Sequence, residues 1–176
     1  MIYSRLYDSP AGRMMLGVVG GGGVCLCDWI DSRHFERNRR NAVAAFGEIV
    51  PGENAPDCEQ KALDKIVRRL DGYFSGERKD FDLRLSPAGT MFQKRIWTVL
   101  SAIPYGSTTT YGEVAQAVGR AEAVRAVAAA IGANPISIII PCHRVVAKDG
   151  SLTGYAGGLP AKRLLLAVER SSASAE

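Results

Sequence analysis

The sequence predicts an α+β fold in two parts, a small antiparallel sheet with a helix followed by a mostly helical domain. Runs rich in Val, Ile and Tyr occupy the first thirty residues, whereas apolar residues at helical spacing dominate the second half. With 176 residues, 47% of them hydrophobic and 23% charged, the chain can bury one core or two small ones. We place the domains at residues 1–84 and 91–170, with a connector at 85–90 and a flexible tail at 171–176.

The first domain is expected to contain three strands and one helix. Strands over residues 2–7, 13–19 and 23–30 are rich in β-branched and aromatic residues, and the glycine run at 20–23 forms a loop. Apolar residues recur at helical spacing along residues 59–74. One face of this helix can therefore cover the sheet.

Helices are expected to dominate the second domain. Thr90 caps a first helix, whose apolar positions are Phe92, Ile96, Val99 and Leu100. Thr110 caps a second helix that extends to Val118. Gly119 then ends this second helix, and a third helix follows over residues 121–131. Two short helices joined by a tight turn are the pattern of a helix-turn-helix.

The helix at 121–131 lacks the side chains that read base edges. It offers mainly Ala and Val with one long cation, Arg125, whereas major-groove recognition uses Arg, Asn, Gln or Glu. Small side chains would instead let the backbone approach a groove floor, with the arginine reaching into the base stack. The alternative is that the alanines pack this helix tightly against its neighbour.

Charge is distributed unevenly along the chain. Residues 1–84 carry 13 basic and 13 acidic groups, while residues 85–176 carry 9 basic and 5 acidic groups. The excess positive charge therefore lies in the second part, which is the sign expected of a phosphate-binding surface. A solvated basic face is the alternative interpretation.

A cysteine and a histidine follow the apolar run ISIII. Residues 136–140 are β-branched and predict a buried strand that ends at Pro141. A thiol in an apolar pocket is inert, but one beside an imidazole with its own carboxylate can be held as a thiolate. Neighbouring residues on a strand point to opposite faces, so Cys142 and His143 can cooperate only if the chain turns or a water bridges them. The carboxylate is expected at Glu169, on the helix that begins near residue 160.

Four stretches together resemble one protein family. GTMFQKRIW, IPYGSTTTYGEVA, VRAVAAAIGANPISIIIPCHRVV and GYAGG, in this order and spacing, are similar to the methylated-DNA–protein-cysteine methyltransferases, the alkylguanine-DNA alkyltransferases. The resemblance runs from about residue 2 to residue 169 and implies a C-terminal winged helix-turn-helix domain that holds the reactive cysteine. It also implies that the alkylated guanine is flipped out of the duplex, which costs a few kcal/mol of unstacking.

The resemblance implies a role for each residue of the site. Cys142 is similar to the acceptor thiolate, His143 to its base acting through a water, and Glu169 to the carboxylate that orients the histidine. Asn134 is similar to the asparagine that braces the active-site turn. Tyr111 is similar to the tyrosine that donates a proton to the departing guanine.

Further residues are assigned to the substrate and to DNA in the same way. The Val145 carbonyl accepts from the exocyclic amine of guanine, and the backbone around Ala156 donates to the alkylated oxygen, with Tyr155 and Gly157 in the substrate pocket. Ala156 stands where some relatives have serine, which widens the pocket. Arg144 is assigned a structural role in the turn. The residues expected to contact DNA are Arg125, which fills the gap left by the flipped base, and Thr110, Ala126 and Ala129.

Neither a metal nor a cofactor is expected. Cys25, Cys27 and His34 invite a zinc site, but their spacing is poor for a tetrahedral site and a fourth ligand is not evident. Together with Cys58, the first two cysteines are interpreted as reduced packing residues. The chain shows neither an apolar signal-peptide core at its start nor a membrane-spanning run, so we expect a cytoplasmic protein.

The resemblance implies irreversible, stoichiometric transfer from O6-alkylguanine to Cys142, because an S-alkyl cysteine is a stable thioether. The expected partner is double-stranded DNA, bound through the minor groove with little sequence preference by a protein that is monomeric in solution. O4-alkylthymine as a second substrate, the largest alkyl group accepted and cooperativity along DNA are left open. Two other classes compete: a DNA-binding regulator without chemistry, and a cysteine hydrolase, which needs an oxyanion hole.

Overall fold

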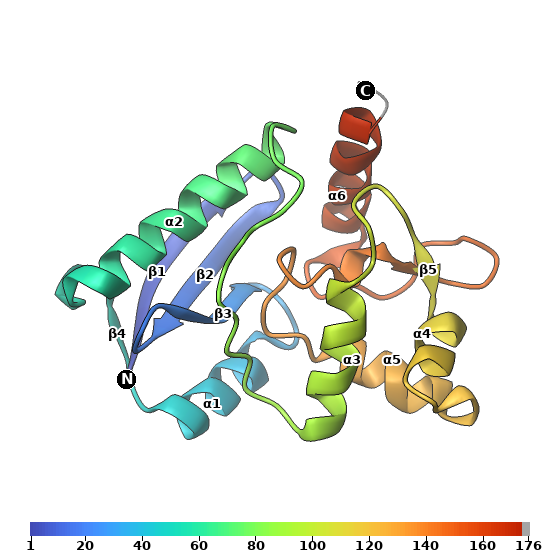
Figure 1. Ribbon diagram of the computed structural model, residues 1–176, viewed down its shortest axis with the longest axis horizontal. Coiled ribbons are helices and arrows are strands. Elements are labelled where there is room, and N and C mark those ends of the chain that lie inside the picture. Colours follow the sequence, from blue (N-terminus) through green and yellow to red (C-terminus); the bar gives the residue numbers. More distant parts are fainter. Residues whose placement is uncertain (174–176) are drawn as a thin grey trace.

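The computed structural model describes residues 1–173, which form two lobes lying side by side (Figure 1). The N-terminal lobe contains a sheet of β1 (Ile2–Ser9), β2 (Gly12–Val19), β3 (Gly23–Trp29) and β4 (Ile49–Pro51). The strand order is β3-β2-β1-β4, and β1 pairs with β2 in register from Ile2–Val19 to Ser9–Gly12. The three expected strands are confirmed.

The sheet is mixed rather than purely antiparallel. Its fourth strand, β4, runs parallel to β1, and it follows the helix α1 (Phe35–Phe46), which the sequence analysis did not predict. A parallel neighbour requires a crossover connection, and α1 supplies it. The helix escaped notice because its buried side is short and partly polar, consisting of Phe35, Asn38 and Ala42.

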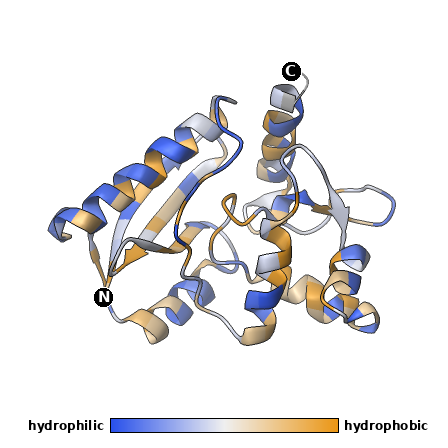
Figure 2. Cartoon of the chain, viewed as in Figure 1, coloured by the Kyte–Doolittle hydropathy of each residue, from blue (hydrophilic) through white to orange (hydrophobic). Residues whose placement is uncertain are grey.

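The helix α2 (Asp57–Phe74) packs on the sheet, following a short 3-10 turn at Gly52–Asn54. Its buried residues recur at helical spacing: Glu59, Leu63, Ile66, Leu70 and Tyr73. Figure 2 shows polar and apolar residues alternating around α2, which is the pattern of a helix with one covered face. The predicted helix at 59–74 is therefore confirmed, with one extra half-turn at its start.

Up to Ala173, the C-terminal lobe is built on four helices and a two-stranded parallel sheet. The helices are α3 (Met91–Ser101), α4 (Tyr111–Ala117), α5 (Val124–Gly132) and α6 (Gly158–Ala173), and the strands are β5 (Thr109–Thr110) and β6 (Val145–Val146). Thr90 and Thr110 close capping boxes at α3 and α4, as their sequences predict. A 3-10 turn at Ala121–Ala123 precedes α5, and Gly119 has a φ of +67° in the break before it.

Two expectations about this lobe were wrong. Residues 136–140 do not form a strand: Ile136 and Ser137 make only isolated bridges, and Ile138 has a φ of +71°. A β-branched run indicates burial, but here the run is buried inside a compact loop rather than in an extended strand. The second error is the tail, since α6 continues to Ala173; residues 174–176 lie outside the described part of the chain.

One hydrophobic core joins the lobes. It includes Leu16 of the sheet, Ile66 of α2, Trp97 of α3 and Leu165 of α6. The edge of β3 that faces away from β2 is hydrogen-bonded to the connector through Val24 and to the 136–140 loop through Cys27. The N-terminal sheet therefore supports the segment that leads to Cys142. In the described part of the chain, no helix is long and apolar enough to cross a membrane.

Candidate active site

Cys142 lies at the start of a 3-10 turn, Cys142–Arg144, directly after Pro141. Its side chain is almost fully buried and lines a cavity of about 400 Å³. The cavity wall also includes Asn134, Tyr111 and the end of α5. The turn expected at Pro141 is confirmed.

Asn134 braces the loop that leads to the cysteine. Its Nδ2 donates to the Ile140 carbonyl at 2.9 Å and lies 3.2 Å from Cys142 Sγ, while its Oδ1 accepts from the Ile136 amide at 3.0 Å. These bonds enclose Ile138, whose positive φ costs on the order of 1–3 kcal/mol for a β-branched residue. The asparagine thus holds a strained loop in one conformation.

His143 and Arg144 converge on Glu169 of α6. His143 Nε2 lies 2.6 Å from Glu169 Oε1, and Arg144 Nε donates to Oε2 at 3.0 Å. The Gly106 amide also donates to Oε2 at 3.0 Å, and Arg144 Nη1 donates to the Ile103 carbonyl. All three side chains are buried. This arrangement supports the expected roles of Glu169 in orienting the histidine and of Arg144 in tying the turn.

The charges of this cluster follow from its contacts. Burial by itself would raise the pKa of Glu169, but the hydrogen bond to His143 and the ion pair with Arg144 lower it to about 2. Burial lowers the pKa of His143 despite its bond to the carboxylate. Near neutral pH, the imidazole of His143 is therefore neutral, and it lies between the ionised Glu169 and the Cys142 turn.

Hydrogen bonding determines which imidazole nitrogen is available. Because ionised Glu169 can only accept, His143 Nε2 carries the hydrogen, and this tautomer is assigned from the network. Nδ1 is then the bare acceptor, and this buried atom has no hydrogen-bond partner among the described residues. Nor does a direct hydrogen bond join it to Cys142 in that part of the chain, so proton transfer from the thiol requires a bridging molecule such as water.

Cys142 is a thiol at neutral pH rather than the thiolate that its neighbours suggested. Burial raises its pKa to about 11, against the lowering effect of the hydrogen bond from Asn134. The adjacent histidine in the sequence indicates a thiolate, but the sequence does not show how completely the thiol is desolvated. In the structure desolvation dominates, so the proton leaves the thiol only as the reaction proceeds.

Tyr73 is a site residue that the sequence analysis missed. It comes from α2 in the other lobe, and its hydroxyl donates to Glu169 Oε1 at 2.8 Å. The same hydroxyl lies 3.4 Å from His143 Nε2. The only available signal was its position on the covered face of α2, which indicates packing and carries no information about a partner in α6.

The expected substrate residues are only partly brought together. Tyr111, Tyr155 and Ala156 line the cavity with Cys142. Val145 is buried, and its carbonyl accepts from Lys162 Nζ at 2.6 Å. Gly157 lies instead in a neighbouring hollow of about 550 Å³, packed so closely on Trp29 that a Cβ would sit 2.5 Å from the indole Nε1.

Three of the four expected DNA-contacting residues share one side of α5. Arg125, Ala126 and Ala129 are exposed or line the cavity, while the opposite side of the helix is buried. Thr110 caps the preceding helix, and its Oγ1 bonds Glu113. Arg33 and His34 from the N-terminal lobe also line the cavity, a contribution that the sequence did not indicate.

The remaining cysteines divide by exposure. Cys25 and Cys27 are buried, as expected of packing residues, whereas Cys58 is exposed at the start of α2 and the packing interpretation was wrong there. Its place in the first turn of a helix, on the side facing solvent, explains the difference. Within residues 1–173, no three His, Cys, Asp or Glu side chains are grouped to hold a metal ion.

Comparison with known sequences identifies the C-terminal lobe. A protein-family model described as the DNA-binding domain of 6-O-methylguanine DNA methyltransferase matches residues 91–171. A methylated-DNA–protein-cysteine methyltransferase of Mycobacterium tuberculosis is 42% identical over 176 residues, covering 100% of this chain and 97% of the relative. One from Methanosarcina acetivorans is 55% identical over 104 residues, or 59% of this chain and 67% of the relative.

Solved structures of related proteins superpose on nearly the full length of this chain. The Mycobacterium tuberculosis O6-methylguanine methyltransferase superposes with a TM-score of 0.79 and 40% identity, covering 100% of this chain and 97% of the other. A structure described as the OGT of that organism in complex with DNA has a TM-score of 0.79 and 39% identity, covering 97% and 94%. Fold and sequence together define an O6-methylguanine-DNA methyltransferase of α+β architecture. The chain belongs to the family of methylated-DNA–protein-cysteine methyltransferases. Its enzyme activity is that of a methylated-DNA–protein-cysteine methyltransferase.

Proposed function

We propose that this protein repairs DNA by direct damage reversal, transferring the alkyl group of O6-alkylguanine irreversibly to Cys142 after base flipping. The observation that carries the proposal is the position of Cys142, whose thiol lines a cavity bounded by the end of α5. The outer side of the same helix presents Arg125 to solvent. A base leaving a duplex bound at α5 would enter beside the thiol.

The hydrogen-bond network supports a route for the transfer. The Cys142 proton passes through a water to His143 Nδ1, and Glu169 stabilises the imidazolium through Nε2. The thiolate attacks the alkyl carbon, an S–C bond forms, and the C–O6 bond breaks with its electron pair going to guanine. Tyr111, which lines the cavity, donates the proton that guanine takes up, and the imidazolium of His143 then returns a proton to the tyrosinate through solvent. The thioether has no electrophilic carbonyl, so water does not regenerate the thiol.

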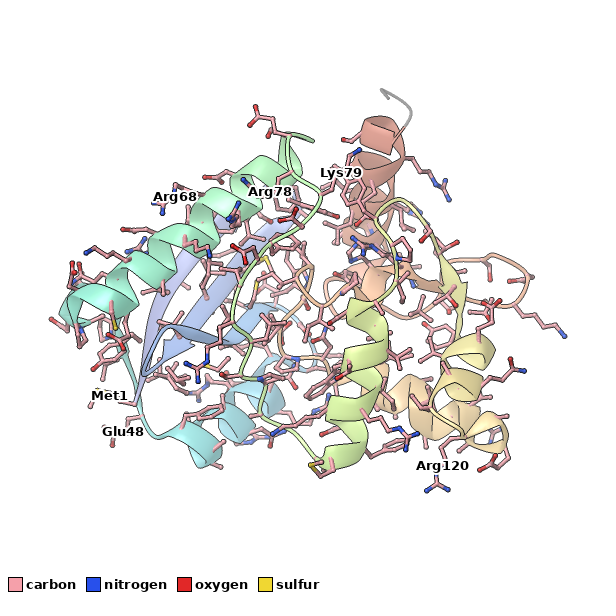
Figure 3. All side chains as sticks on the ribbon, in the orientation of Figure 1. Met1, Glu48, Arg68, Arg78, Lys79 and Arg120 are labelled. Carbon is pink, nitrogen blue, oxygen red and sulfur yellow. The ribbon has the colours of Figure 1, made fainter. Side chains whose placement is uncertain are left out.

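DNA recognition is assigned to the helix pair α4 and α5 in a winged helix-turn-helix. The exposed side of α5 carries small residues around Arg125, which suits a close approach to the minor groove. Arg120, in the turn before α5, extends into solvent at the same end of the molecule (Figure 3). The sparse base-reading groups favour binding with little sequence preference, by a protein monomeric in solution.

Mass spectrometry of the intact protein tests the proposal. After one exposure to duplex DNA containing O6-methylguanine, we expect a mass gain of one methyl group, located on Cys142. The Cys142→Ala variant should keep DNA binding and gain no mass, whereas Cys58→Ala, which removes an exposed thiol, should react normally. Catalytic turnover with unchanged protein mass would indicate a hydrolase, and binding without transfer would indicate a regulator.

Base flipping is tested separately at Arg125. If its side chain fills the gap left by the base, Arg125→Ala should react slowly with alkylated duplex but almost normally with free O6-benzylguanine, because a free base leaves no stack. The two single-turnover rates measure this difference. Equal loss on both substrates would show that Arg125 supports the fold or pocket instead.

A further inference from the structure

Tyr73 reaches the active-site cluster from the N-terminal lobe. It lies in the last turn of α2, is fully buried, and is separated from Glu169 by 96 positions in the sequence. Its ring is held by an aromatic cluster, with Phe81 at 5.5 Å and Tyr105 at 6.1 Å between centroids. Packing therefore fixes the direction in which its hydroxyl points.

The Tyr73 hydroxyl and the imidazole compete for one oxygen atom. Glu169 Oε1 accepts from the hydroxyl at 2.8 Å and from His143 Nε2 at 2.6 Å. Burial and the neighbouring carboxylate raise the pKa of Tyr73 far above its usual value, so the hydroxyl stays neutral and keeps donating. A permanent donor on Oε1 disperses part of the carboxylate charge that would otherwise stabilise an imidazolium.

The charged and titratable groups around His143 come from several elements. Glu169 favours the imidazolium, whereas Arg144 and Lys162 oppose it, and Cys142 lies next in sequence. Tyr73 is the contribution of the other lobe. Removing its hydroxyl takes a donor from Oε1 and leaves the other four groups in place. The imidazolium should then become easier to form.

We propose that Tyr73 is a positioning residue of the N-terminal lobe that keeps His143 neutral, with Nδ1 free to accept a proton, by hydrogen-bonding Glu169. The inference rests on the proposed roles of Cys142, His143 and Glu169. It makes the N-terminal lobe part of the proton-transfer machinery. A histidine that is already protonated cannot take the proton of the thiol, so the transfer rate falls as pH drops through the pKa of His143.

The experiment compares two variants that each lose one buried hydroxyl. Tyr73→Phe removes the donor to Glu169 and keeps the ring. Tyr105→Phe is the matched control, since its hydroxyl is buried in the same aromatic cluster without a hydrogen-bond partner among the described residues. Its ring, which lies 5.6 Å from the Arg144 guanidinium, is retained. Glu169→Gln serves as the reference for loss of the carboxylate.

Single-turnover rates on methylated duplex are measured against pH. For Tyr73→Phe, the acid limb of the rate–pH profile should move up by about one pH unit. At a given pH on that limb, the rate should therefore fall about tenfold, while the rate on the high-pH plateau should be nearly unchanged. The ¹⁵N resonances of His143 should report the same pKa increase. Tyr105→Phe should leave the profile where it was.

The outcomes separate the inference from the proposed function. An unmoved acid limb in Tyr73→Phe, while Glu169→Gln changes the profile, would overturn the role of Tyr73 alone. A uniform rate loss at every pH together with a lower melting temperature would assign Tyr73 to packing and overturn it equally. If Glu169→Gln also left the profile unchanged, the proposed role of Glu169 would fail as well.

Discussion

Two buried carboxylates, one from each lobe, support the turn around Cys142 in different electrostatic states. Glu169 is bound by Arg144 and several other donors, and its pKa is lowered to about 2. Asp28 of β3 is equally buried but forms no ion pair among the described residues, and it accepts from neutral groups that include the Trp29 amide at 2.9 Å and Asn38 Nδ2 at 2.8 Å. Burial raises its pKa to about 6. Burial alone therefore does not determine the charge of a carboxylate, because a cation within hydrogen-bond distance reverses its effect.

The two carboxylates also differ in what each holds in place. Glu169 orients the histidine of the proposed proton path, whereas Asp28 holds Asn38, whose Nδ2 also lies 3.4 Å from the Asn134 carbonyl. Asn134 in turn braces the strained loop before Cys142. One carboxylate thus acts on the chemistry through charge, and the other acts on the loop through neutral hydrogen bonds.

The largest effect is expected from removing the cation beside Glu169. Arg144→Met leaves a buried carboxylate with only neutral donors, which should destabilise the protein by about 3–5 kcal/mol at pH 7. Glu169 has a lowered pKa, so its stabilising contribution is present above about pH 4.5 and is lost as pH falls toward 2. The difference between variant and wild type in urea unfolding should therefore shrink in acid.

The matched control is Arg5→Met, which breaks an ion pair with Asp64 whose side chains are 37% and 47% exposed. It should cost less than about 1 kcal/mol, because solvent screens the pair. Similar losses in the two variants would mean that the buried pair contributes no more than an exposed one.

A smaller effect of opposite sign is expected at Asp28. Its folded pKa lies above the ordinary 3.8, so its contribution to stability is full below about pH 4 and is lost as pH rises through about 6. A shift of this size corresponds to about 3 kcal/mol, and a lost hydrogen bond costs the Asn variant about 1 kcal/mol. Because the lost hydrogen bond costs the same at both pH values, Asp28→Asn should be about 1 kcal/mol less stable than wild type at pH 4 and about 2 kcal/mol more stable at pH 7, a gain of about 3 kcal/mol.

Unfolding free energies measured at both pH values check this. The informative quantity is the change in the difference between variant and wild type, which removes the contributions of all other groups. A difference that stays constant with pH would show that the pKa of Asp28 is not raised in the native state.

The smallest effect is expected where burial is absent altogether. Cys58→Ser changes an exposed thiol, so the unfolding free energy should stay within about 0.5 kcal/mol of wild type and alkyl transfer should be unaffected. Cys25→Ser places an unpartnered hydroxyl in the core and should cost about 1–3 kcal/mol. Equal costs in thermal unfolding would contradict the assignment of Cys58 to the surface.

Local patterns predicted the elements that depend on local interactions. The strands β1 to β3 follow from β-branched alternation, and α3 and α4 begin directly after Thr90 and Thr110 because a capping box joins residues only three positions apart. The same patterns misjudged the 136–140 loop and passed over α1. A short apolar run has the same composition in a strand and in a buried loop, and the covered side of α1 is too small and polar to give a clear period.

The sequence by itself determined the order of the main elements, the turn at Pro141 and the grouping of Cys142 with His143. Only the tertiary structure decided that the thiol is protonated, because desolvation depends on every segment that packs around it. The tertiary structure also supplied Tyr73 to Glu169 and Asn38 to the Asn134 turn, two contacts that each span 96 positions. A contact over such a distance leaves no periodic or capping signal in either segment, since it exists only once the two lobes share one core.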